Sequence, residues 1–130
     1  MMPKERAKEK EITKQRDSTK DYKPLEPLPI VRALFLVFIQ RHPKSTGYDL
    51  MGLISDSTKG LIELKSGTVY SELRRLEGLG FVKSAQEESG RRRRSYVITK
   101  SGIDELSQIA KQMQMRVDYI INPLLDMMNQ

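Results

Sequence analysis

Between Ser66 and Thr99 the chain carries two groups of side chains that bind anions: hydroxyls and arginines on a helix-like segment, then four consecutive arginines on a hairpin-like segment. Guanidinium groups bind phosphates in bidentate geometry, and hydroxyls donate to phosphates or to base edges. This chemistry favours a nucleic-acid contact. The candidate DNA-binding residues are Ser66, Thr68, Tyr70, Ser71, Arg74, Arg75, Arg91, Arg92, Arg93 and Arg94.

The charge of the chain agrees with a polyanionic partner. The sequence holds 23 lysines and arginines against 17 acids, a net charge of +6, and its pI is near 9.6. Residues 81–100 alone hold six basic residues and two acids. Successive side chains of a strand point to opposite faces, so the four arginines cannot all face one phosphate backbone. A charge run can also be a solvated surface, and Arg74 or Arg75 can instead pair with Glu72 or Glu77.

The composition argues against catalysis, metal binding and membrane insertion. One histidine, no cysteine, no phosphate-binding glycine loop and no histidine–carboxylate cluster leave no constellation for nucleophilic, acid–base or metal chemistry. We expect no enzyme activity, no metal and no cofactor, and we interpret His42 as a helix-end residue. The lack of cysteine fits a reducing compartment, no apolar run reaches the about 18 residues that span a bilayer, and no secretory signal is recognisable. These features predict a cytoplasmic protein.

Three helices and a hairpin are predicted to position the candidate residues, which makes the fold class mostly α with a small β-hairpin. The first helix starts near Pro29, runs to Pro43 and is apolar around most of its circumference, so we expect it at the centre of the core. Thr46 opens the second helix, with Asp49 as its capping-box partner. The predicted inward residues of this helix are Tyr48, Leu50, Met51 and Ile54. Residues 55–65 are interpreted as a turn with a short extended segment.

The third helix is predicted over about residues 66–79, with Ser66 as its N-cap. Val69, Leu73 and Leu76 recur at helical spacing and face the core, and Tyr70 lies between the inner and outer faces. Strands at 81–86 and 92–99 follow, joined by residues 87–90. This order is that of a winged helix-turn-helix. Its third, recognition helix enters a DNA major groove, and its hairpin, the wing (about 81–99), reaches phosphates or the minor groove.

The C-terminal helix, residues 101–130, begins near Thr99 or Ser101 and carries apolar residues at alternating spacings of three and four. Such a heptad seam packs along another helix, and because the chain has no second helix of this length, we expect a second copy as its partner. Pro123 after Asn122 predicts a kink or a restart. Methionines of this helix are interpreted as interface filler. The predicted dimer seam is Ile103, Leu106, Ala110, Met113, Val117, Ile120, Leu124 and Met127.

Residues 1–26 form a basic arm in this scheme, before a winged-helix domain at 27–100 and a dimerisation helix at 101–130. Residues 1–23 hold eight basic residues and five acids, but after Met1 and Met2 only Ala7 and Ile12 are apolar before Tyr22. So few apolar residues cannot offset the entropy of ordering, which predicts a flexible arm. The alternative is an arm that follows DNA phosphates or enters a minor groove.

Five motifs stand in a fixed order within residues 30–112. They are Gly47-Tyr48-Asp49-Leu50, Ser66-Gly67-Thr68-Val69-Tyr70, Leu73-Arg74-Arg75-Leu76-Glu77-Gly78-Leu79-Gly80-Phe81-Val82, Glu87-Glu88-Ser89-Gly90-Arg91-Arg92-Arg93 and Tyr96-Val97-Ile98-Thr99-Lys100-Ser101-Gly102. This ordered set closely resembles the PadR family of transcriptional regulators, in the branch with a single short C-terminal helix. The resemblance implies a homodimeric winged-helix DNA-binding repressor that dimerises through its C-terminal helix.

Two departures from the family pattern concern the recognition helix and the effector. The family's recognition helix begins with Gly-Thr-Leu-Tyr-Pro, where this chain has Val69 and Ser71 in place of the leucine and the proline. Some members bind aromatic effectors between subunits through tryptophan. This chain has no tryptophan, so that chemistry is not carried over, and any small-molecule effector stays unknown.

Three classes of function remain to be separated. The first is a sequence-specific homodimeric regulator acting on an inverted-repeat operator in double-stranded DNA. The second is a non-specific architectural DNA binder, which would bind random and palindromic duplexes equally. The third is a winged-helix protein-interaction module, whose arginines would meet an acidic protein and which would not bind duplex DNA at moderate salt.

Overall fold

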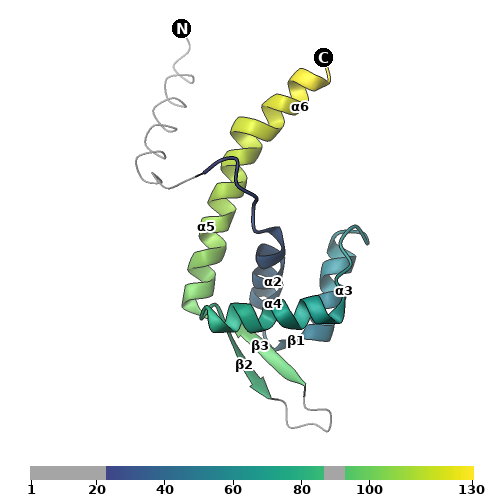
Figure 1. The fold of residues 1–130 in the computed structure, drawn as a ribbon, viewed down its shortest axis with the longest axis vertical. Coiled ribbons are helices and arrows are strands. Elements are labelled where there is room, and N and C mark those ends of the chain that lie inside the picture. Colours follow the sequence, from purple (N-terminus) through teal and green to yellow (C-terminus); the bar gives the residue numbers. More distant parts are fainter. Residues whose placement is uncertain (1–22, 87–92) are drawn as a thin grey trace.

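The computed structural model describes residues 23–86 and 93–130. The arm up to residue 22, the loop 87–90, Arg91 and Arg92 lie outside the described residues. The described elements, in chain order, are α2 (Ile30–Arg41), β1 (Ser45–Thr46), α3 (Gly47–Ser57), α4 (Ser66–Gly78), β2 (Val82–Gln86), β3 (Arg94–Ile98), α5 (Lys100–Arg116), the π-helical turn η1 (Val117–Ile121) and α6 (Asn122–Met128). The predicted fold class, mostly α with a small β-hairpin, is confirmed, and the hairpin strands β2 and β3 belong to a three-stranded antiparallel sheet (Figure 1).

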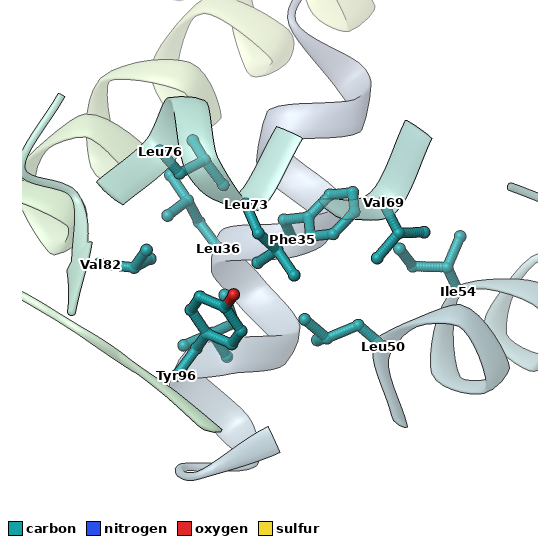
Figure 2. Packing of buried hydrophobic residues seen from close by; sticks show 10 residues of the cluster. Phe35, Leu36, Leu50, Ile54, Val69, Leu73, Leu76, Val82 and Tyr96 are labelled. Carbon is teal, nitrogen blue, oxygen red and sulfur yellow. The ribbon is translucent and has the colours of Figure 1, made fainter. Parts of the chain in front are cut away.

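The core lies where α2, α3 and α4 meet the sheet (Figure 2). The fully buried side chains of α4 are Val69, Leu73 and Leu76, as their spacing predicts. They pack with Phe35 and Leu36 of α2, the predicted central helix, and burial of each such side chain contributes about 2 kcal/mol. His42 caps the C-terminus of α2 as expected. The recognition helix is thus held in place by its inner face.

Helix α3 begins with the predicted capping box. The Asp49 amide donates to Thr46 Oγ1 at 3.1 Å, and the Thr46 amide donates to Asp49 Oδ2 at 3.0 Å. The prediction that Tyr48 faces inward is wrong, because its side chain is 69% exposed. Helix α3 buries Gly47, Leu50 and Ile54, and position 48 is two residues, or about 200°, away from Leu50 on the helix.

The sheet has a third strand that the sequence does not indicate. Its order is β1-β3-β2, with Ser45 opposite Tyr96 and Thr46 opposite Ser95. Strand β1 has only two residues, both polar, so it carries no alternating pattern. Lys44, at φ 67°, turns the chain into it, and the Lys44 amide donates to the Tyr96 carbonyl at 3.0 Å.

The start of α4 and the connection before it differ slightly from the prediction. The N-cap is Lys65, Ser66 is the first helical residue, and no side chain caps the helix. Helix α3 extends to Ser57, so the turn is shorter than predicted. Residues 62–65 have no regular secondary structure and do not join the sheet of the described residues, although Lys65 itself is extended.

At Pro123, where the sequence predicts a kink or a restart, the helical path changes from the π-helical turn η1 to α6, which begins at Asn122 with the proline in its first turn. Asn122 has helical angles, φ −62° and ψ −46°, so the chain stays helical there and Asn122 is not an N-cap. Proline lacks an amide hydrogen, and its ring collides with the carbonyl four residues earlier in a regular helix. The wider turn η1 lies directly before it, with the Asn122 amide bonded to the Val117 carbonyl five residues back, and accommodates the ring without a break.

The first half of α5 packs against α2 of the same chain, which corrects the expectation that this helix lacks an internal partner. Arg32 Nη1 lies 2.6 Å from Glu105 Oε2, Leu106 packs against the core, and Ile109, which the predicted seam omits, is buried. Of the two predicted starts, Thr99 and Ser101, the structure has Thr99 as the N-cap of α5, where its side chain accepts from the Gly102 amide.

The remaining seam residues lie on more exposed parts of α5, η1 and α6. Met113, Val117 and Ile120 are half-buried within one chain, and Ile103, Ala110, Leu124 and Met127 are exposed. Figure 1 shows these helices extending away from the sheet. Among the described residues, no helix combines the length and apolarity needed to cross a membrane, and no three metal-ligating side chains come together.

Candidate nucleic-acid interface

The outer face of α4 presents the side chains that the sequence selects. Because Val69, Leu73 and Leu76 are buried, the remaining positions of this helix lie at the surface. Neither Arg74 nor Arg75 forms an ion pair within residues 23–86 and 93–130, so the pairing with Glu72 or Glu77 is not made there. The exposed candidates on α4 are Ser66, Thr68, Tyr70, Ser71, Arg74 and Arg75.

Glu77 instead connects the recognition helix to the wing. Its Oε2 accepts from the Ser84 amide at 3.0 Å and from Ser84 Oγ at 2.6 Å. Arg94 Nη1 donates to Ser84 Oγ at 3.0 Å. These bonds join α4, β2 and β3 in one chain, so the wing and the recognition helix are held in a fixed relation.

A second set of hydrogen bonds, at the other end of the strands, connects the end of β3 to the turn after α4. The Thr99 amide donates to the Phe81 carbonyl at 3.0 Å, and Thr99 Oγ1 donates to the Gly80 carbonyl at 2.6 Å. Gly80 has φ +81°, a conformation that glycine adopts without strain. Thr99 therefore fixes the turn after α4 and caps α5 at the same time.

A hollow of about 400 Å³ lies where the start of α3, the outer face of α4 and the base of the wing meet. Arg93 stands over the Tyr48 ring, 5.8 Å from its centroid, which is a cation–π contact. Tyr48 is not among the residues selected from the sequence, because the spacing of residues within α3 does not indicate that Arg93 lies beside it. The hollow is lined by Thr46, Gly47, Tyr48, Tyr70, Arg74, Arg93, Arg94 and Tyr96.

The tyrosines of the hollow differ in burial. Tyr70 is 43% exposed, and its ring packs against Gly47, where an added Cβ would be 2.7 Å from Tyr70 Cε1. Tyr96 is only 4% exposed, and its ring stands among the core side chains in Figure 2. Burial, followed by the charge of Glu77, raises the pKa of Tyr96, so its hydroxyl stays protonated at neutral pH and can donate a hydrogen bond.

The structure thus brings four sequence-selected candidates together, Tyr70 and Arg74 from α4 and Arg93 and Arg94 from the wing. Ser66, Thr68, Ser71 and Arg75 lie on the same helix surface outside the hollow. The remaining two candidates, Arg91 and Arg92, are outside the described residues.

Comparison with known proteins identifies the family. The model of the PadR-like transcriptional regulators matches residues 35–108, which include α3, α4, the wing and the start of α5. The chain belongs to the PadR-like family of transcriptional regulators. The PadR-like family is one of regulators and not of enzymes, in agreement with the composition. Among curated proteins, no sequence matches the chain.

Solved PadR-like structures share the fold. A transcriptional regulator from Clostridium thermocellum is 31% identical, with a TM-score of 0.65 over 72% of this chain and 90% of that one. A PadR family regulator from Eggerthella lenta is 22% identical, with a TM-score of 0.64 over 95% and 97%. Bacillus subtilis PadR in complex with operator DNA is 22% identical, with a TM-score of 0.56 over 64% of this chain and 46% of that one.

Proposed function

We propose that this PadR-like protein is a homodimeric, sequence-specific DNA-binding repressor that acts on an inverted-repeat operator. The observation that carries the proposal is the outer surface of α4 and the wing. Arg74, Arg75 and Arg93 are exposed on this surface. The acid between them and the wing, Glu77, accepts two hydrogen bonds from Ser84, which link α4 to β2. A rigid basic helix beside a basic hairpin fits a major groove and the adjoining backbone.

The contacts follow from the two parts of this surface. Helix α4, about residues 66–79, lies in the major groove with Thr68 and Ser71 near its N-terminal end toward base edges. The wing, about residues 81–99, contacts phosphates or the minor groove through its arginines. The operator complex formed by Bacillus subtilis PadR, which shares the fold, supports this docking.

The second copy is held by the C-terminal helices. Exposed apolar residues gather on η1 and α6. Within residues 23–86 and 93–130, the main contacts of η1 are with α5 and α6, its neighbours along the same helical segment. The exposed apolar residues are Tyr119, Ile121, Leu124, Leu125, Met127 and Met128. In this division residues 1–26 are an arm, 27–100 the DNA-binding domain and 101–130 the dimerisation helix.

A selection of bound sites from a random pool of duplex DNA, using the purified full chain, tests this function. We expect an enriched inverted repeat whose half-site centres are separated by about 34–36 Å, one helical turn. Enrichment of no sequence, with equal binding to random and palindromic DNA, would identify an architectural binder. Absence of duplex binding at low salt would point to a protein-interaction module.

Variants then separate base readout from phosphate contact. Thr68→Ala should change the enriched sequence, whereas Arg92→Ala with Arg94→Ala should weaken binding to every duplex and lower the slope of log K against log salt by about 0.9 per lost contact. Lys111→Ala, an exposed position on α5, removes one positive charge as a control. If the wing variant alone abolishes sequence discrimination, this assignment of roles is wrong.

Sedimentation tests the dimer. Val117→Lys places a charge in the half-buried seam and should give a monomer, whereas Ser107→Lys at an exposed position outside the seam should leave the dimer intact. A dimeric Val117→Lys protein would contradict the predicted interface.

A further inference from the structure

The hollow between α3, α4 and the wing has the lining of an anion site. Three arginines, Arg74, Arg93 and Arg94, and three tyrosines, Tyr48, Tyr70 and Tyr96, are among its eight lining residues. None of the eight lining residues is an acid. Only one of these arginines, Arg94, has a hydrogen bond within the described part of the chain, through Nη1 to Ser84. Its other guanidinium donors remain open.

The Tyr96 hydroxyl is a second, independent indication of a ligand. The residue is 96% buried and lines the hollow, and no hydrogen bond joins its hydroxyl to any residue that the structure describes. Among those residues the one fully buried side-chain polar atom without a partner is Arg32 Nε, so the Tyr96 hydroxyl oxygen itself is open to solvent. Its ring is packed in the core, which fixes the position of the hydroxyl, while the O–H donor stays free. The hydroxyl can therefore donate to an acceptor that enters the hollow from outside.

The position of the hollow indicates which kind of acceptor group it binds. In the proposed docking α4 occupies a major groove and the wing reaches the phosphates or minor groove beside it, so one phosphate backbone runs between them. The hollow lies between α4 and β3. It therefore faces that backbone, and its three positive charges and neutral donors match a phosphodiester better than a base edge.

We propose that this hollow binds one phosphodiester of the DNA backbone in each half-site, with Tyr96, Arg74 and Arg93 as the direct donors and Tyr48 positioning Arg93 through its ring. The proposal rests on the proposed function and adds to it a defined phosphate site and two residues, Tyr48 and Tyr96, that sequence reasoning did not select. The contact orients α4 and does not distinguish bases.

Single neutral methylphosphonate substitutions, placed one at a time along the selected operator, test the site. For the wild-type protein we expect one position in each half-site at which neutralisation weakens binding about ten-fold, the effect of a hydrogen-bonded charge. Tyr96→Phe should weaken binding to the unmodified operator by a similar factor. At that one position the two losses should not add, because each removes the same contact.

Two further variants keep the test decisive if Tyr96→Phe is unstable. Arg93→Gln, at an exposed position, should also show non-additive loss at this position, while Lys111→Gln on α5 should lose little and behave additively at every position. Thermal unfolding of each variant identifies losses caused by misfolding.

The outcomes separate this inference from the function on which it rests. If the wild-type protein selects an operator but Tyr96→Phe and Arg93→Gln bind it normally, or lose affinity additively at every phosphate, the phosphate site is refuted and the function stands. If the wild-type protein selects no operator, the function itself fails. Altered sequence preference in Tyr96→Phe would assign this residue to base readout instead and would also overturn the proposal.

Discussion

Among the glycines of the described residues, Gly102, in the first turn of α5, is the position where one added methyl group should lower the stability of the fold most. A Cβ there would be 2.7 Å from Ile98 Cγ1 and closer still to the carbonyl oxygen of Phe81, and real Cβ atoms do not approach other atoms this closely. That carbonyl accepts from the Thr99 amide, and Thr99 Oγ1 in turn accepts from the Gly102 amide. Gly102→Ala therefore strains the connection between the wing and α5.

The magnitude follows from three contributions. Forcing a methyl group into a packed site costs about 1–3 kcal/mol, and this site is at the upper end because one neighbour is backbone. Displacing the Phe81 carbonyl weakens a hydrogen bond worth about 1 kcal/mol. Alanine regains up to about 1 kcal/mol over glycine in a helix. The net loss is about 3 kcal/mol, or a melting temperature lower by about 10 °C for a domain of this size.

Gly52 provides the matched control, because it lies inside α3 and its added Cβ would meet no atom within 4 Å. Gly52→Ala should raise stability by about 0.5–1 kcal/mol. Thermal unfolding followed by circular dichroism measures both changes. All variants are compared at one protein concentration, because the melting temperature of any self-associating protein depends on concentration. The same substitution should thus have opposite signs in two helices. A Gly102→Ala protein as stable as wild type would refute the close approach.

Three other perturbations test the core and its caps. Thr46→Ala removes the capping box and should cost about 1 kcal/mol in chemical denaturation; no loss would contradict the cap. Arg32 and Glu105 are about three-quarters buried, so a double-mutant cycle should give a coupling of about 1 kcal/mol, and a value near zero would show that the 2.6 Å bond does not persist in solution. Leu73→Ala should cost about 2–5 kcal/mol, whereas Leu79→Ala, at a half-exposed position, should cost under about 1 kcal/mol; equal losses would contradict the orientation of α4.

Features encoded by local spacing could be predicted from the sequence. The inner face of α4, the Thr46–Asp49 box and the Thr99 cap each depend on residues within about seven positions, where helical geometry fixes which side chains meet. The outward candidates on α4 follow from the same geometry, since a buried face of Val69, Leu73 and Leu76 leaves the others exposed. These are also the residues for which the chemistry of DNA contact was recognisable.

Features that depend on packing between distant elements could not be predicted in this way. The heptad spacing of α5 fits a second copy and the chain's own α2 equally well, and only the structure shows that Leu106 faces the core while Ile109 is buried. The continuity through Pro123 has a similar origin. A proline forbids a regular helical bond but does not decide between a break and a wider turn, which the surrounding helix determines.

The missed role of Tyr48 has one structural cause, the unrecognised strand β1. In the antiparallel register Ser45 lies opposite Tyr96 and Thr46 opposite Ser95. Strand β1 ends directly before α3, and Arg93 directly precedes β3, so this pairing brings the first turn of α3 beside Arg93, whose guanidinium stands over the Tyr48 ring. A two-residue polar strand has no alternating pattern, so neither its pairing with β3 nor the contacts that depend on this pairing can be predicted from the sequence. The hollow proposed to bind phosphate is therefore a product of the β1–β3 pairing. A substitution that weakens this pairing should displace Tyr48 from Arg93 and reduce DNA affinity, although it touches neither the recognition helix nor any arginine.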